Sequence, residues 1–385
     1  MSKIGRFALM VILCSGIGAQ IRESTRAINI EIAVRVFKGD AFVPGLTKVD
    51  FEVLEDEKLQ ALEACYFINK NVLQKTADSN AAKPPPPRSP EIKPDLTRTF
   101  VLIFSATRYY PDFGDAVSFF FDNVYKRGDN IICSTPRRAY NFNSNALDRY
   151  TKEEAVRQLV SFLKKDILAA GQEYRSLIDQ LKPTADSSES GPDPWTLTLL
   201  EKLRDLNTLD EKKVLSFADA LSKREGQKYV FCILQKALMP IPEALDQEKF
   251  LLLRDAGLDA RKVKQAFSDR NIQFHFIYAT RAGDDGSGLD VANQASLALS
   301  GIRMHEFKQD FFSAFKDIAD ATGGSVESSA DAKLALSSAA DFSGTYYLLY
   351  YAPANYQPDG RFRKIDVRVK SGGVRVVHRE GYVAD

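Results

Sequence analysis

The stretch Thr99–Asp112, TFVLIFSATRYYPD, decides the fold class of this chain. Phe100 to Phe104 form an unbroken apolar run, with a proline-rich segment upstream and a Ser-Ala-Thr segment directly downstream. A run this short that is apolar on both faces is typical of a central strand in a sheet covered on both sides. The following residues have the composition of a strand-to-helix turn, where open α/β sheets place their ligand sites. We therefore expect an α/β domain with a functional surface at this turn.

Alternating strands and helices continue along the middle of the chain. The expected strands are Asn130–Thr135, Ala139–Phe142, Tyr229–Leu234 and Ile272–Tyr278, and the expected helices are Asp115–Tyr125, a stretch ending at Arg270, and Phe311–Ala321. A long helix begins at Thr151, which forms a capping box with Glu154. With a second helical region at Trp195–Leu221, it predicts a helical insertion over about 151–222. We favour helices that cover the sheet over helices that form a groove for a partner.

Both ends of the chain predict strands of a half-buried sheet. Ile28 to Val36 alternate apolar and polar residues, a period of two. Further strands are expected at Phe51–Leu54, Ala61–Ile68, Thr345–Tyr351, Ile365–Val369 and Val374–Val377. The N-terminal strands are too few to close a sandwich alone, so they need the C-terminal ones. The predicted organisation is a β-sandwich from residues 28–68 and 341–385, a proline-rich linker at 69–98, and an inserted α/β domain at 99–340.

The N-terminus has the layout of a secretory signal. Lys3 and Arg6 precede an apolar run from Phe7 to Ala19, which is too short to span a bilayer comfortably. We expect residues 1–19 to be removed, with a buried N-terminal strand as the alternative. The expected product is exported, whether periplasmic, secreted or on the cell surface, and has no integral membrane segment. No lipid anchor is expected, because Leu13 stands where lipoprotein signals have a small residue.

Composition and motifs narrow the function classes. The chain has 52 basic and 51 acidic residues, a net charge of +1, which argues against a general nucleic-acid surface. After signal removal three cysteines remain, so no disulfide framework is expected. No phosphate loop, nucleophile elbow or metalloprotease motif occurs. Cys133 or Cys232 could form a nucleophile pair with His275, since all three fall on candidates for neighbouring strands, but both thiols lie inside the predicted strands and not at their ends. We expect a non-enzymatic protein.

Segments at both ends resemble a known family. VPGLT at 43–47, DFEV at 50–53, YYLLYY at 346–351 and FRKI at 362–365 resemble the terminal signatures of exported bacterial proteins related to von Willebrand factor type A domains. The resemblance covers nearly the whole mature chain and implies a doubly wound, Rossmann-like sheet. Many such domains hold a divalent ion through an Asp-x-Ser-x-Ser motif, a distant Thr and a later Asp.

The resemblance implies that this metal-ion-dependent adhesion site is degenerate. The motif falls on Ser105, Thr107 and Tyr109, and the later Asp falls near Gln235 or Lys236. Neutral hydroxyls compete poorly with water for Mg²⁺, so no metal or other cofactor is expected.

The favoured function is a protein-binding or scaffold module. Its expected partner surface consists of Ser105, Thr107, Arg108, Tyr109 and Tyr110. Tyr and Arg are typical interface anchors, although the tyrosines could instead only cap the sheet. One alternative is a metal-dependent adhesin that uses Asp112 or Asp115 as relocated carboxylates. A hydrolase of unknown type is the third hypothesis.

Overall fold

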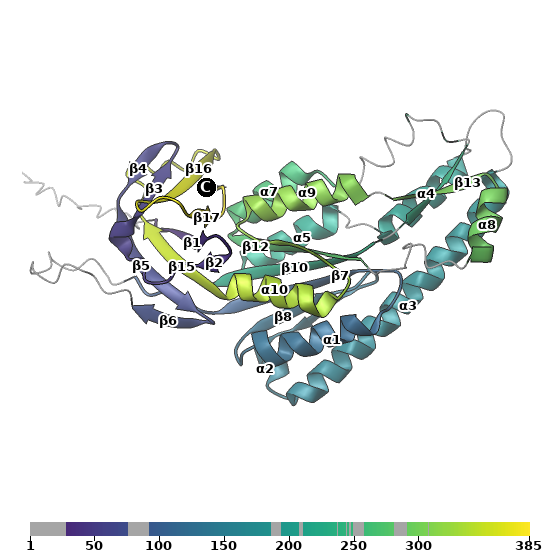
Figure 1. Cartoon of the computed structure of the whole chain (residues 1–385), viewed down its shortest axis with the longest axis horizontal. Coiled ribbons are helices and arrows are strands. Elements are labelled where there is room, and N and C mark those ends of the chain that lie inside the picture. The colour runs from purple at the N-terminus through teal and green to yellow at the C-terminus, as the bar shows by residue number, and fades with distance from the viewer. Residues whose placement is uncertain are drawn as a thin grey trace, which may run out of the picture.

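The computed structural model describes residues 28–75, 92–185, 194–207, 211–236, 238–243, 245, 248, 258–280, 291–306 and 308–385. The predicted signal at 1–19 and most of the predicted linker lie outside these residues. The molecule is elongated, with strands from both chain ends at one extremity, an α/β unit in the middle and a smaller helical unit at the other extremity (Figure 1). Within the described ranges, no helix is long and apolar enough to cross a membrane.

The α/β unit contains a doubly wound, mostly parallel sheet. Its strands are β7 (Arg98–Ser105), β8 (Asn130–Ser134), β9 (Ala139–Phe142), β10 (Gln227–Gln235), β12 (Ile272–Ala279) and β14 (Val326–Ser329). They lie in the order β14-β12-β10-β7-β8-β9, and only β9 is antiparallel to its neighbour. β7 is buried at every residue, which confirms the predicted central strand. The sequence pattern did not predict β14, because VESS carries only one apolar residue.

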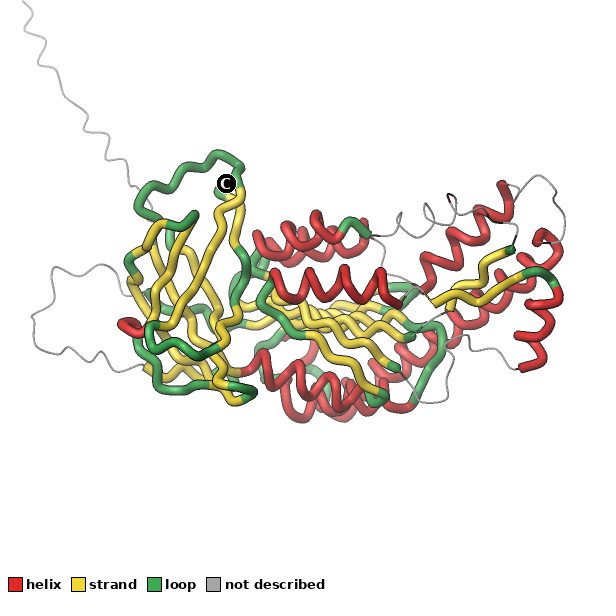
Figure 2. The backbone as a smooth tube through the Cα atoms, turned by 45° about the horizontal axis from the view of Figure 1, so that its top comes forward, coloured by secondary structure: helices red, strands yellow, loops and turns green. Residues whose placement is uncertain are grey.

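Helices cover both faces of this sheet (Figure 2). One face packs against α1 (Pro111–Phe119), the first half of α3 (Lys152–Ala185) and α10 (Ala332–Gly344). The other face packs against α5 (Glu211–Ser222), α7 (Ala260–Asp269) and α9 (Lys308–Ala321). Successive residues of β7 enter the two cores in turn, Phe100 one and Val101 the other. This explains the unbroken apolar run, since neither side of the strand meets water.

The strands at the chain ends form two antiparallel sheets. The first contains β1 (Ile30–Lys38), β2 (Ala41–Phe42), β5 (Leu62–Asn69), β6 (Val72–Lys75), β15 (Thr345–Tyr351) and β17 (Arg375–Val377). The second contains β3 (Phe51–Glu55), β4 (Lys58–Gln60), β16 (Phe362–Val369) and β18 (Gly381–Val383), and a short helix, η1 (Lys48–Asp50), precedes β3. Val34 of β1, Val53 of β3 and Val367 of β16 belong to one hydrophobic core. N-terminal and C-terminal strands are therefore interleaved, as β1 and β15 pair directly.

The region from 151 to 222 is divided between two places. α5 and the first half of α3 cover the sheet. The second half of α3 packs instead with α4 (Pro194–Asn207), α8 (Val291–Leu299), β11 (Leu238–Pro242) and β13 (Ile302–Glu306) around a separate core. The predicted helix from the end of β10 to Arg270 was wrong at β11, because this segment pairs with β13 about sixty residues later, which local periodicity does not show.

The helix predicted at Asp115–Tyr125 begins earlier and changes its geometry. α1 starts at Pro111, a residue that favours the first turn of a helix. It continues into η2 (Phe120–Val124), one π-helical turn, before Tyr125 becomes extended. A four-residue helix, α2 (Ser144–Leu147), then precedes α3.

Candidate functional site

The strand order reverses between β7 and β10, and their carboxyl ends lie side by side at this point. The chain winds in one direction from β7 to β8 and in the other from β10 to β12, so the sheet order reverses between β7 and β10. Open α/β sheets bind ligands at this point. Ser105, the last residue of β7, pairs with Leu234, so Gln235 stands beside the β7–α1 loop, which we define as residues 106–110.

The side chain of Gln235 holds this loop. Its Oε1 accepts hydrogen bonds from the backbone N–H groups of Thr107 and Arg108, both at 3.1 Å. Its Nε2 donates to the carbonyl oxygen of Arg108 at 3.2 Å. Only an amide can accept and donate in this way, because an ionised carboxylate has no donor. In the sequence, Gln235 was notable only because it stands near the position where the family resemblance implies an aspartate. No residue near it in the sequence indicated this contact.

Helix α3 packs closely against the same loop. A Cβ atom at Gly171 of α3 would lie 2.2 Å from the Thr107 carbonyl oxygen, so only glycine allows this approach. The Tyr109 hydroxyl lies over Gly114 of α1, where an added Cβ would be 2.9 Å away. The Lys164 ammonium lies 5.7 Å from the centre of the Tyr109 ring. Burial, followed by the charges of two nearby aspartates, raises the pKa of Tyr109.

The predicted partner surface is smaller than the sequence suggested. Ser105 and Tyr110 are buried, so the expectation that they present a contact surface was wrong. Ser105 is enclosed between neighbouring strands, and Tyr110 packs on Phe113, in agreement with the capping alternative. Thr107 and Tyr109 are half-buried, and Arg108 is exposed with its guanidinium 5.5 Å from the Tyr110 ring centre. What a partner can reach is the tip of the loop.

Asp112 and Asp115, the two carboxylates expected as relocated metal ligands in the adhesin alternative, lie in different environments. Asp112 Oδ2 accepts a hydrogen bond from the backbone N–H of Ala332, the first residue of α10, at 3.1 Å. Its Oδ1 is buried and has no hydrogen-bond partner among the described residues. Asp115 is exposed. Lys236 forms an ion pair with Glu306 at 3.4 Å. The described part of the chain contains no group of three or more Asp, Glu, His or Cys side chains placed to hold a metal.

The cysteines and His275 do not form a nucleophile pair. Cys232 and His275 lie in neighbouring strands, but Cys232 belongs to one face of the sheet, and His275 stacks on Phe231, which belongs to the other. Cys133 is on β8, three strands and about 14 Å from the strand of His275. Burial raises the pKa of Cys133 to about 12 and also raises that of Cys232, so neither is a thiolate at neutral pH. The expectation of neighbouring strands was wrong for Cys133.

His275 has a structural contact instead. Its Nδ1 is 2.9 Å from the Ser325 hydroxyl oxygen, and burial lowers its pKa well below the usual value. The ring is therefore neutral in the folded protein.

No family model matches the chain, and no curated protein does either. Several solved structures align with the chain, among them two that align over long parts of it. One is an aerotolerance-related membrane protein from Bacteroides fragilis NCTC 9343 with multiple mutations to serines, at 8% identity, 63% of this chain, 96% of that chain and a TM-score of 0.26. The other is the human COPII-coat protein Sec24c, at 9% identity and a TM-score of 0.29, where 75% of this chain aligns with 43% of that chain. The interpretation below rests on the contacts within this chain.

Proposed function

We propose that this chain is a non-enzymatic, exported module related to von Willebrand factor type A domains, which binds or scaffolds a protein partner without a metal ion. In this proposal the two terminal sheets form a β-sandwich into which the α/β unit is inserted. The observation that carries it is the position of the Gln235 amide, which holds the loop where a metal-binding aspartate is expected.

The chemistry around the β7–α1 loop supports a metal-free site. Mg²⁺ requires six oxygen ligands in an octahedron and usually takes one or two from carboxylates. Here Gln235 Oε1 is already engaged with two backbone N–H groups, and its Nε2 is a donor. Lys236, the next residue, adds a positive charge near the carboxyl end of β10, balanced by Glu306. A cation would have to displace these contacts and gain no carboxylate there.

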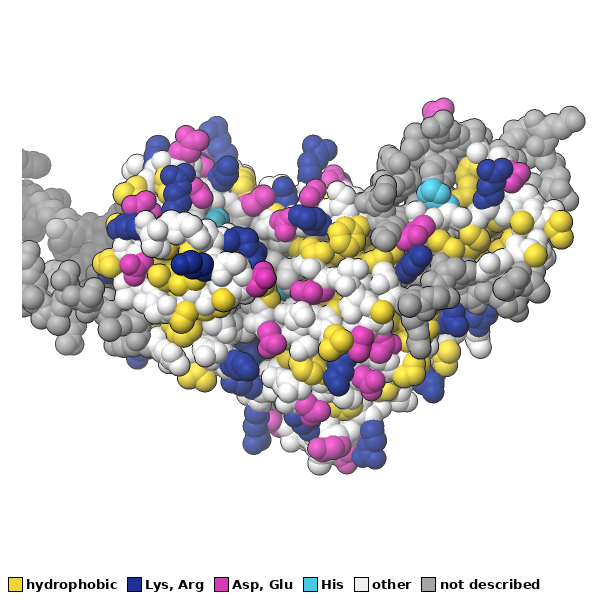
Figure 3. Space-filling model, viewed as in Figure 1, with side chains coloured by type: hydrophobic (Ala, Val, Ile, Leu, Met, Phe, Trp, Pro, Cys, Tyr) yellow, Lys and Arg dark blue, Asp and Glu magenta, His cyan; other side chains and the backbone are white. Residues whose placement is uncertain are grey.

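The partner surface that we propose is the loop tip, with Arg108 at its centre and Thr107 and Tyr109 beside it. Arg and Tyr are enriched among residues that dominate binding energy, because they offer a large contact area and directional donors. The loop is held by Gln235 and by α3, so little conformational freedom is lost on binding. Elsewhere on the surface, acidic and basic side chains are interspersed on the face shown in Figure 3, which fits binding through shape more than through a single-sign field.

One observation favours the adhesin alternative. Asp112 Oδ1 is a buried carboxylate oxygen without a hydrogen-bond partner in the described ranges, and burying such an oxygen is costly. A cation between Asp112 and Asp115 would satisfy it. Against this, the other oxygen of Asp112 already accepts from the start of α10.

Thermal denaturation in EDTA and then in millimolar Mg²⁺, Mn²⁺ or Ca²⁺ separates the two hypotheses. A site filled to 100 times its dissociation constant adds about 2.7 kcal/mol, a shift of several degrees in Tm. We expect no shift with any of the three ions. A shift that Asp112→Asn abolishes would replace our proposal with the adhesin.

The surface itself is tested by affinity capture with the wild-type chain and two variants. Arg108→Ala should lose the partner, whereas Arg127→Ala, a change at an exposed arginine elsewhere on the α/β unit, should retain it. Equal capture by both variants would show that the loop tip is not the binding surface.

A further inference from the structure

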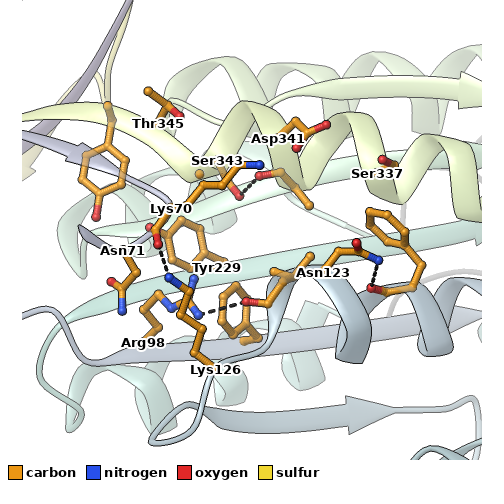
Figure 4. Close-up of a pocket in the computed structure, with 16 residues that line it drawn as sticks. Lys70, Asn71, Arg98, Asn123, Lys126, Tyr229, Ser337, Asp341, Ser343 and Thr345 are labelled. Atoms are coloured by element: carbon orange, nitrogen blue, oxygen red, sulfur yellow. Dashed lines mark hydrogen bonds between the residues drawn. The ribbon is translucent and has the colours of Figure 1, made fainter. Parts of the chain in front are cut away.

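A pocket lies at the other end of the α/β sheet. Its volume is about 380 Å³, and it opens where the terminal strands meet the α/β unit, beside the first residues of β7 and β10 (Figure 4). Arg98 of β7 is the first residue of the strand whose last residue, Ser105, reaches the β7–α1 loop. Ligand pockets typically have volumes of about 300–1,000 Å³ and occur preferentially between structural units. The pocket is separate from the site described above.

A tight hairpin turn forms one wall. Lys70 and Asn71 join β5 to β6 with φ of 47° and 61°, the left-handed conformation that two-residue hairpin turns require. The Lys70 N–H donates to the carbonyl oxygen of Gly344, at the end of α10, at 2.8 Å. The Lys126 ammonium donates to the carbonyl oxygen of Lys70. These contacts tie the turn to the α/β unit, so this wall is rigidly built.

The opposite wall contains the π-helical turn η2. Asn123 and Val124 of this turn line the pocket, and π-helical turns are frequent at functional sites because the wider helix rearranges backbone groups. The Val124 carbonyl oxygen accepts from Arg98 at 3.0 Å. Arg98 also makes two hydrogen bonds to Asp129, at 3.0 and 2.5 Å. The charge of Arg98 is therefore neutralised within the wall.

The remaining groups define what the pocket can bind. With Arg98 neutralised, the charged lining consists of Lys70, Lys126 and Asp341, which leaves one net positive charge. The Oδ1 atom of Asn71 is buried and has no hydrogen-bond partner within the described residues, so it lacks a donor. Phe119 is half-buried at the pocket and adds an apolar surface.

We infer that this pocket binds a small organic monoanion, a carboxylate on an apolar ring that also carries a hydroxyl group. The carboxylate forms ion pairs with the ammonium groups of Lys70 and Lys126, and its single negative charge balances the net positive charge of the pocket lining. On binding, the Asn71 side chain turns so that its Oδ1, buried in the free protein, accepts from the hydroxyl group, and the ring packs against Phe119.

Calorimetric titration of the purified protein with 4-hydroxybenzoate and with benzoate tests this inference. We expect saturable binding with Kd on the order of 1 mM for such small ligands. One additional hydrogen bond should make 4-hydroxybenzoate bind about 3- to 10-fold more tightly than benzoate. Asn71→Gly, which keeps the left-handed turn, should remove that difference. Lys126→Gln should weaken both ligands and reduce their dependence on salt concentration.

A steric variant provides the decisive control. Ser337 of α10 lines the pocket, while the next residue, Ser338, is exposed and does not. Ser337→Phe should abolish binding of both ligands, and Ser338→Phe should leave it unchanged. The inference is overturned if neither ligand saturates, or if binding survives in the Ser337→Phe protein. Equal affinities for the two ligands would reject the hydroxyl contact at Asn71. If Ser337→Phe fails to fold, unchanged titrations of Asn71→Gly and Lys126→Gln would still refute the inference.

Discussion

Removal of the Gln235 side chain is the sharpest test of how the β7–α1 loop is held. Gln235→Ala deletes three hydrogen bonds and leaves the Thr107 and Arg108 N–H groups without their acceptor. Each bond is worth about 0.5–1.5 kcal/mol net, and water reaches the exposed tip of the loop and replaces part of the loss, so we expect a destabilisation of about 2–3 kcal/mol. At roughly 2 °C per kcal/mol, the Tm should fall by about 4–6 °C.

A matched variant gives the baseline for this measurement. Gln180 is exposed on α3, and its amide donates to Ser176 of the same helix. Gln180→Ala should therefore change stability by less than about 0.5 kcal/mol. Limited trypsin digestion adds a local readout, because a released loop exposes the bond after Arg108, and cleavage there should accelerate only in Gln235→Ala. A Tm equal to that of Gln180→Ala, with unchanged cleavage, would refute the proposed role of Gln235.

Three further outcomes are expected. Gly171→Ala should destabilise the protein by about 1–3 kcal/mol through the close approach, a loss that the higher helix propensity of alanine reduces by about 1 kcal/mol. Gly344→Ala, with no atom within 4 Å of the added Cβ, should be nearly neutral in the same thermal assay. Equal effects of the two changes would contradict the close approach of α3. Burial lowers the pKa of His275 and of His378, so below about pH 6.5 the unfolded chain binds more protons than the folded one. The contribution of these histidines to the free energy of unfolding should therefore be fully present above that pH. As the pH is lowered, the free energy of unfolding, measured by denaturant titration, should fall by up to about 1.4 kcal/mol per pH unit for each histidine. A flat profile between pH 7.5 and 5 would disagree with this expectation. Because the pKa of Cys133 is raised to about 12, iodoacetamide at pH 8 should modify this thiol only after unfolding, and modification of the native protein would show that the strand opens.

Local sequence patterns predicted the structure correctly where it depends on residues that are close together in the sequence. The strand Thr345–Tyr351 was predicted at its observed bounds, because five of its seven residues are Thr or Tyr, which favour strands, and such a run needs no distant partner to be recognised. The capping box at the start of α3 was also correct. The Thr151 N–H donates to Glu154, and the Glu154 N–H donates to the Thr151 hydroxyl.

The patterns failed where a residue depends on a distant segment. β11 has too little periodicity to predict a strand, and it forms one because β13 supplies its hydrogen bonds. Ser105 and Tyr110 were wrongly assigned to the partner surface for the same reason, since their burial comes from neighbouring strands and from α1.

Sequence by itself determined the two-sided central strand and the alternation of strands and helices. Each of these depends on residue type and on local spacing, which the linear chain contains. Tertiary structure decided that Gln235 holds a loop 128 residues away, and that a turn at Lys70 reaches Gly344 to line a pocket. Such contacts arise from the way whole layers pack, and nothing local to Gln235 or Lys70 indicates its partner.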